Sequence, residues 1–255
     1  LQGDYLLNLD SEDDGIITIG CAGGLESLVY FDYTPEAAPA DLVYFKLNIT
    51  KMHGGHSGSD IDKGYACATK QIARLLYRLE QKFDFRLARE AVAIVGVKPD
   101  DKEKLSVELN AYIADVKNEY KATEPHMEVL CESVEKPATV IDADTARRII
   151  SAAYVAQHGI YSMDHDIKEL VETSTNFASI KRLEAEKTIY IEHFSRSSVE
   201  SRKYELAGQI EALYKLAGAR KVDYTGGYQG WQPNVNSKLL ADAVAQWEKL
   251  YGVKA

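Results

Sequence analysis

The sequence predicts an α+β fold in which helices cover one face of an antiparallel sheet, an arrangement that occurs twice along the chain. Some segments carry apolar residues at helical spacing, whereas others carry them at alternate positions or in short continuous runs. These segments follow one another as helix, strand pair, helix and strand, in two successive cycles. Because the two halves share no residue-level identity, we expect a duplicated ferredoxin-like architecture without a sequence repeat.

The N-terminal part is expected to hold short strands and glycine-rich turns. Residues 6–9 and 16–19 are apolar runs that predict strands, and Cys21-Ala22-Gly23-Gly24 interrupts the second of them. Residues 43–49 predict a further strand, because apolar side chains alternate with polar ones there. A loop with glycines on both sides of a histidine follows this strand.

The first cycle is expected over residues 62–134. Apolar residues at helical spacing predict an amphipathic helix over 62–81, and the short apolar run 91–97 predicts a buried strand. A proline followed by two aspartates starts a second helix over 99–120. A strand over 127–134 completes this cycle.

The second cycle repeats this order. An aspartate, Asp142 or Asp144, caps its first helix, and Gly218 ends its second. We expect helices over 142–157 and 199–218, strands over 170–182, 187–195 and 220–224, and a final amphipathic helix over 236–251.

Composition narrows the class of protein. The 255 residues are 45% hydrophobic and carry a formal net charge of −9, which argues against a nucleic-acid partner. No apolar run approaches the roughly 20 residues of a membrane helix, so we expect no membrane association. Three widely spaced cysteines form no disulfide framework, which favours a reducing cytoplasm. The chain begins without methionine and both ends look cut, so we expect a piece of a longer protein.

His56 is the sharpest candidate for chemistry. It lies in Gly54-Gly55-His56-Ser57-Gly58, between a predicted strand and a predicted helix. Flanking glycines allow a tight bend that leaves the imidazole open to a ligand, where it can donate to an oxyanion or a carboxylate. The alternative is a glycine-rich turn whose histidine points outward without a role.

Three further residues are weaker candidates. Asp10 ends an apolar run, where a carboxylate can bind a divalent cation or merely cap a turn. Arg196 follows a predicted strand, where a guanidinium can grip a substrate carboxylate or form a surface ion pair. Asn176 either contacts a ligand or is a satisfied polar residue on a strand edge.

Six short motifs occur in an order that resembles one family. They are LNLDSE at 7–12, GCAGG at 20–24, GGHSG at 54–58, ETSTN at 172–176, RS at 196–197 and GWQP at 230–233. The chain is similar from about residue 5 to its end to the aminoacyl-histidine dipeptidases, also called Xaa-His dipeptidase or peptidase D, a branch of the M20 metallopeptidases.

The resemblance implies a two-zinc hydrolase whose α/β catalytic domain is interrupted by an α+β lid, or dimerisation domain. The lid corresponds to residues 25–222, and residues 1–24 and 223–255 correspond to remnants of the catalytic domain. By the same resemblance, Asp10 matches a metal ligand, His56 the lid histidine that supports the substrate carbonyl or its oxyanion, and Arg196 the arginine that holds the substrate carboxylate. Asn176, at the end of the ETSTN motif, is a further candidate for substrate binding.

The chain also departs from the family. The early His-x-Asp metal motif, the bridging aspartate and the Glu-Glu pair with the general base are absent upstream of Asp10. One ligand of a two-metal site cannot hold zinc tightly, so we expect this chain by itself to retain no zinc and to be inactive. Between Ala88 and Arg89 it also lacks a loop that carries a substrate-contacting asparagine in relatives.

The resemblance leads to one function hypothesis and the residues leave a second one open. The first is part of a zinc-dependent dipeptidase that hydrolyses Xaa-His dipeptides, carnosine-like β-alanyl-histidine included, and that forms a homodimer through the lid. The second is a non-catalytic module that binds an amino acid or mediates association.

Overall fold

The computed structural model describes residues 4–9, 14–89 and 92–254. In this part of the chain, helices and antiparallel strands form a mixed fold, which confirms the predicted α+β class. One sheet has five strands in the order β11-β1-β10-β9-β8. Its strands are β1 (Gly23–Asp32), β8 (Gly159–Met163), β9 (Val171–Leu183), β10 (Thr188–Ser197) and β11 (Lys221–Tyr228).

A second sheet has four strands in the order β4-β5-β3-β6. Its strands are β3 (Val43–Thr50), β4 (Arg86–Arg89), β5 (Ala93–Val97) and β6 (Glu128–Val134), and a separate two-stranded ribbon pairs β2 (Pro35–Ala37) with β7 (Thr139–Ile141). The helices are α1 (Ala68–Glu80), α2 (Lys102–Glu119, after the 3-10 turn η1 at Pro99–Asp101), α3 (Ala143–Val155), α4 (Glu200–Leu216) and α5 (Lys238–Tyr251).

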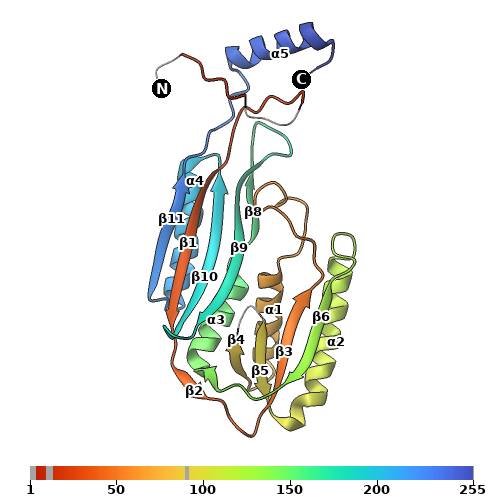
Figure 1. Ribbon diagram of the computed structural model, residues 1–255, viewed down its shortest axis with the longest axis vertical. Coiled ribbons are helices and arrows are strands. Elements are labelled where there is room, and N and C mark those ends of the chain that lie inside the picture. Colours follow the sequence, from red (N-terminus) through yellow and green to blue (C-terminus); the bar gives the residue numbers. More distant parts are fainter. Residues whose placement is uncertain (1–3, 10–13, 90–91, 255) are drawn as a thin grey trace.

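The two sheets lie side by side and share one helix layer (Figure 1). Helix α4 packs on β1 and β10, while α1 contacts both β3 and β9 and so joins the two sheets. A single hydrophobic cluster therefore includes side chains from both sheets and from the helices. Its least exposed members include Val29, Phe31, Leu47, Leu75, Tyr112 and Tyr214.

The segments that flank the sheets meet at one end of the molecule. The backbones of Cys21 and Trp231 exchange two hydrogen bonds, with N···O distances of 2.8 and 2.7 Å. Helix α5 lies beyond this pairing (Figure 1). No helix among the described residues is long and apolar enough to cross a bilayer.

Most of the predicted elements are confirmed. The strands expected over 43–49, 127–134, 170–182 and 187–195 correspond to β3, β6, β9 and β10. Helix α3 begins as predicted, because the Asp142 carboxylate accepts a hydrogen bond from the Thr145 backbone at 2.8 Å. Gly218 follows α4 with φ of 89°, the left-handed conformation that glycine adopts readily.

Two predicted strands are wrong and one central strand is not predicted. Residues 6–9 and 16–19 form no regular secondary structure. The chain instead enters β1 at Gly23, where the glycine pair predicts a break. A Cβ at Gly23 would lie 2.4 Å from the Gly230 nitrogen, so glycine is needed there for close backbone approach inside the sheet.

The helix expected over 62–81 begins six residues later, at Ala68. The buried carboxylate of Glu124 accepts hydrogen bonds from the backbone N–H groups of Ala66 (3.0 Å) and His53 (2.7 Å). These bonds hold the preceding segment as an irregular loop, which we call the 53–66 loop. A distant residue thus overrides the helical pattern of the sequence.

Candidate functional site

The 53–66 loop, the start of α1 and strand β9 enclose a groove of about 220 Å³. The groove is lined by His53, His56, Ser57, His158 and Asn176, together with apolar neighbours such as Phe177. The structure therefore brings together two of the residues that the sequence singled out, His56 and Asn176, although 120 positions separate them in the chain.

The ring of His56 has one defined donor. Its Nδ1 accepts hydrogen bonds from the backbone N–H groups of Gly58 (3.2 Å) and Ser59 (3.0 Å). A neutral imidazole that accepts at Nδ1 carries its proton on Nε2. The loop thus leaves an exposed Nε2–H that can donate to an oxygen of a ligand.

Asp60 holds the backbone around His56. Its Oδ2 accepts from the His56 N–H at 2.6 Å, and its Oδ1 pairs with Lys63 Nζ. The hydrogen bond from Lys63, followed by the one from the His56 backbone, lowers the pKa of Asp60 below its ordinary value. The carboxylate therefore stays charged at neutral pH and keeps the turn closed.

Arg196 projects from β10 toward the same loop. Its Nη1 donates to Tyr228 Oη at 2.9 Å and its Nη2 donates to Ser57 Oγ at 3.3 Å. The guanidinium carbon lies 4.5 Å from the centre of the Phe194 ring. Among the described residues no carboxylate pairs with this guanidinium, so its charge is solvated by hydroxyls and a ring face alone.

Gly58 separates His56 from Arg196. A Cβ at this position would lie 3.2 Å from His56 Cε1 and 3.1 Å from Arg196 Nε. Both candidate side chains therefore face the same backbone position. Asn176 lies on β9 opposite Phe194 of β10, two residue pairs away from the pair that Arg196 forms with Ser174. The loop that carries His56 thus lies beside the part of the five-stranded sheet that carries Asn176 and Arg196.

Two known dipeptidases are similar to this chain in sequence or in structure. No family model matches the chain. The cytosol non-specific dipeptidase of Escherichia coli (strain K12) is 31% identical over 263 residues, which covers 98% of this chain and 54% of that protein. The crystal structure of aminoacylhistidine dipeptidase from Vibrio alginolyticus superposes with a TM-score of 0.93 at 31% identity, and the match covers 100% of this chain and 54% of that one.

Both comparisons support the resemblance of this chain to the M20 dipeptidases. The chain spans about half the length of the relatives it matches, 54% in both cases. The resemblance to the M20 dipeptidases implies bound zinc, which needs several His, Cys, Asp or Glu ligands at one place. The described residues contain no group of three or more His, Cys, Asp or Glu side chains that could hold a metal ion. Asp10, the predicted ligand, lies outside the described residues.

Sequence reasoning missed the histidine on the far wall of the groove. His158 Nδ1 accepts from the Phe177 N–H at 3.1 Å. Burial, followed by the nearby charge of Lys70, lowers the pKa of His158 to about 4. Behind it, His193 stacks on Phe177 with ring centres 4.4 Å apart, and its Nε2 lies 2.8 Å from Tyr214 Oη. Nothing local in the sequence marks either residue as buried.

These two histidines make stability depend on pH. Burial, with smaller effects from His158 and Lys70, lowers the pKa of His193 to about 3. Both rings stay neutral in the folded chain while they gain protons in the unfolded chain below about pH 6.5. The free energy of unfolding should therefore fall as the pH drops from 6.5 toward 4, by up to about 1.4 kcal/mol per pH unit for each histidine. Urea titrations at several pH values measure this slope.

A variant isolates the contribution of His158. Asn at this position can still accept from the Phe177 N–H but does not titrate, so His158→Asn should lower the slope by up to about 1.4 kcal/mol per pH unit. His126→Asn, at an exposed histidine, is the matched control. An unchanged slope in His158→Asn would show that the folded state protonates His158 as readily as the unfolded state does.

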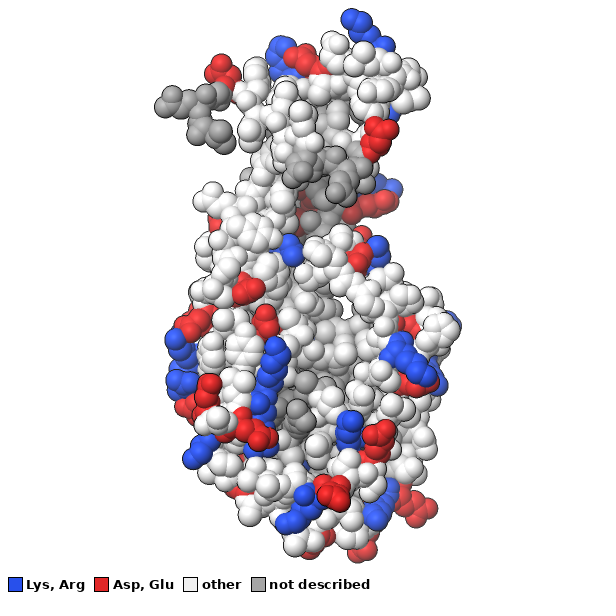
Figure 2. Space-filling view, viewed as in Figure 1, with Lys and Arg blue, Asp and Glu red and all other residues white. Residues whose placement is uncertain are grey.

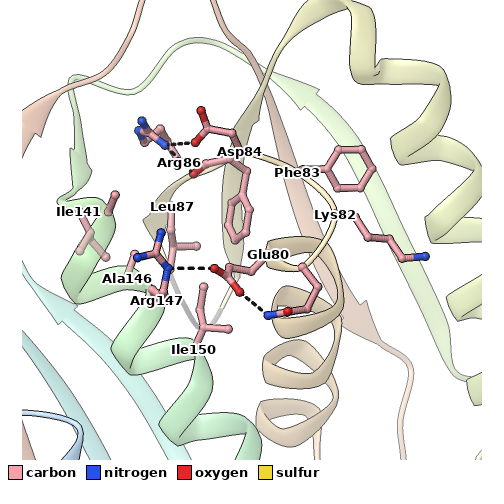
Figure 3. A pocket seen from close by; sticks show the side chains of 13 residues that line it. Glu80, Lys82, Phe83, Asp84, Arg86, Leu87, Ile141, Ala146, Arg147 and Ile150 are labelled. Carbon is pink, nitrogen blue, oxygen red and sulfur yellow. Dashed lines mark hydrogen bonds and ion pairs between the residues drawn. The ribbon is translucent and has the colours of Figure 1, made fainter.

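A larger hollow of about 450 Å³ lies elsewhere, between the end of α1, β4 and α3 (Figure 3). Its charged groups are already paired, Arg147 with Glu80 at 3.1 Å and Arg86 with Asp84 at 2.6 Å inside the hollow, and Lys82 with Glu108 outside it. On the face shown in Figure 2, acidic and basic side chains are likewise interspersed. The groove lined by His56 and Asn176 is therefore the better candidate site, because the Arg196 guanidinium, which has no carboxylate partner, contacts Ser57 of its loop.

Proposed function

We propose that this chain is part of a dipeptidase that hydrolyses Xaa-His dipeptides, carnosine-like β-alanyl-histidine included. The observation that carries the proposal is the uncompensated guanidinium of Arg196 beside the Nε2–H of His56. A free C-terminal carboxylate matches the first group and a peptide carbonyl matches the second. The names of both relatives, a cytosol non-specific dipeptidase and an aminoacylhistidine dipeptidase, support this substrate class.

In this scheme His56 donates to the oxygen of the scissile carbonyl as negative charge develops there. Arg196 binds the substrate carboxylate and so orients the peptide, and Asn176 contributes a further polar contact from β9. A donor placed before the reaction stabilises the transition state without reorganisation of solvent. The described residues supply these binding and orienting groups, but they contain no set of metal ligands.

We further propose a division of the chain into a lid and two flanks. The sequence placed the lid at 25–222, with residues 1–24 and 223–255 as remnants of a catalytic domain. Because those limits fall inside β1 and β11, we propose to extend the lid to residues 23–228. One half contains β3, β4, β5 and β6, and the other contains β1, β9, β10 and β11. Numbered 1 to 4 in chain order within each half, both sets of strands have the spatial order 4-1-3-2, which supports a duplicated ferredoxin-like lid.

Three further properties are proposed for the whole protein: its metal content, its cellular location and its oligomeric state. We propose two zinc ions in its active site, with Asp10 as one ligand, and a cytoplasmic location, as the name of the Escherichia coli relative suggests. We also propose a homodimer through the lid. Sedimentation of this chain at tens of micromolar is the direct check, and a clean monomer there would contradict a lid-to-lid dimer.

Parallel peptidase assays of the whole protein and of this chain test the proposed function. With β-alanyl-histidine and zinc, the whole protein should turn over and this chain alone should not, because the described residues lack a metal site. Turnover by this chain well above buffer, lost on Asp10→Ala, would contradict the expected inactivity. A whole protein that cleaves other dipeptides but no Xaa-His substrate would overturn the proposed substrate class.

A further inference from the structure

Two residues outside the proposed reaction support Arg196, Tyr228 by direct contact and Lys203 through Tyr228. Tyr228, the last residue of β11, accepts a hydrogen bond from Arg196 Nη1 at its hydroxyl. Lys203 of α4 is only 1% exposed, and its Nζ donates to the Tyr228 carbonyl oxygen at 2.7 Å. Glu200 pairs with this ammonium at 2.8 Å. A buried lysine thus fixes the backbone of the residue whose side chain holds Arg196.

The packing around Tyr228 depends on a glycine. A Cβ at Gly24 of β1 would lie 2.5 Å from Tyr228 Cε1 and 2.6 Å from Phe194 Cζ. Because Gly24 has no side chain, both rings can pack over β1, with Tyr228 extending from β11 and Phe194 from β10. The guanidinium of Arg196 stacks on the face of the Phe194 ring, and its Nη1 donates a hydrogen bond to the Tyr228 hydroxyl. Residues from β1, β10, β11 and α4 therefore build a single support.

Such a support matters because arginine is long and flexible. Its side chain loses much rotamer freedom when a ligand immobilises it. A guanidinium that is already held in place loses less on binding, so the ligand binds more tightly. The Tyr228 hydroxyl and the Phe194 ring supply this restraint without neutralising the charge, which stays available for an anion.

We propose that Tyr228 is a positioning residue that holds Arg196 ready for a substrate carboxylate, and that Lys203 anchors it. The inference rests on the carboxylate-binding role proposed for Arg196. It adds to the site the end of β11, which the resemblance assigned to the flank at residues 223–255. It also accounts for the buried ammonium of Lys203.

Tyr228→Phe in the whole protein tests the inference, because it removes the hydroxyl and keeps the ring. KM for dipeptides should rise roughly tenfold, the scale of one hydrogen bond to a charged group, with kcat within about twofold. KM for dipeptide C-terminal amides should not change. Tyr224→Phe is the matched control: it lies on the same strand, and its hydroxyl bonds to Glu211 instead. Equal effects of the two variants would overturn the inference.

Coupling to Arg196 separates positioning from a general structural role. In an Arg196→Lys background, Tyr228→Phe should change KM by less than about twofold, because the bond it removes is already altered. Full additivity of the two substitutions would show that Tyr228 acts elsewhere.

A readout on this chain keeps the inference independent of activity. The nitrogen-15 NMR signals of the Arg196 guanidinium should report slow side-chain rotation in the wild type and faster rotation in Tyr228→Phe. If they respond while the whole protein cleaves no dipeptide, the proposed function fails and the positioning role stands. If they are unchanged, the positioning role is overturned whatever the activity.

Discussion

Replacing His56 with alanine in the whole protein should lower kcat for dipeptides by about 100-fold or more, the scale of losing one donor to a developing oxyanion. The reason is the fixed donor at Nε2, which follows from the two backbone N–H groups that occupy Nδ1. The ring is exposed, so its removal should leave the melting temperature nearly unchanged. Steady-state kinetics and thermal unfolding of the same preparation check both parts.

A conservative variant sharpens this prediction. The amide nitrogen of His56→Gln can approach the position of Nε2, so this variant should recover part of the lost kcat. A large drop in melting temperature with normal kcat in His56→Ala would instead assign His56 to the stability of the 53–66 loop. That outcome would leave the oxyanion role without support.

Arg196→Lys should raise KM for dipeptides by about 30-fold, within the range expected for lost hydrogen bonds between charged groups. Lysine keeps the positive charge but lacks the planar fork that binds both carboxylate oxygens. It also lacks the flat surface that stacks on Phe194. Because the effect acts through the substrate carboxylate, dipeptide C-terminal amides should lose much less. Parallel KM measurements on acid and amide substrates decide this.

Arg220→Lys is the matched control for that substitution. Arg220 pairs with Asp32 at 2.9 Å, at the other end of β1 from Gly24, and makes no contact with the groove. It should leave both KM values unchanged. If Arg196→Lys weakens acids and amides equally, the carboxylate role of Arg196 is wrong.

Local patterns were sufficient for the elements whose signal lies within one segment. Alternating apolar residues predict β3, and helical spacing predicts α2 and α4, because each of these elements buries one face. The glycines around His56 likewise predict an exposed imidazole ring, because they are neighbours in the sequence. The sequence likewise predicts Asp142 or Asp144 at one helix end and Gly218 at another, because capping interactions span only a few residues, and the structure shows Asp142 as the cap.

Tertiary contacts decided the elements and groups that the sequence reading missed or misplaced. Strand β1 pairs with β10 and β11, more than 150 positions later, and its glycines serve close packing, so no local pattern distinguishes it from a turn. The start of α1 depends on Glu124 in the same way.

The sequence by itself therefore determined the class of the fold, most of its helices and the identity of the candidate residues His56, Arg196 and Asn176. Only the tertiary structure decided which nitrogen of His56 donates, that Arg196 faces it across Gly58, and that Tyr228 supports the guanidinium. The physical reason is one of range. Periodicity and capping act over a few residues, whereas a site forms where strands far apart in the chain pair and place their side chains on one face.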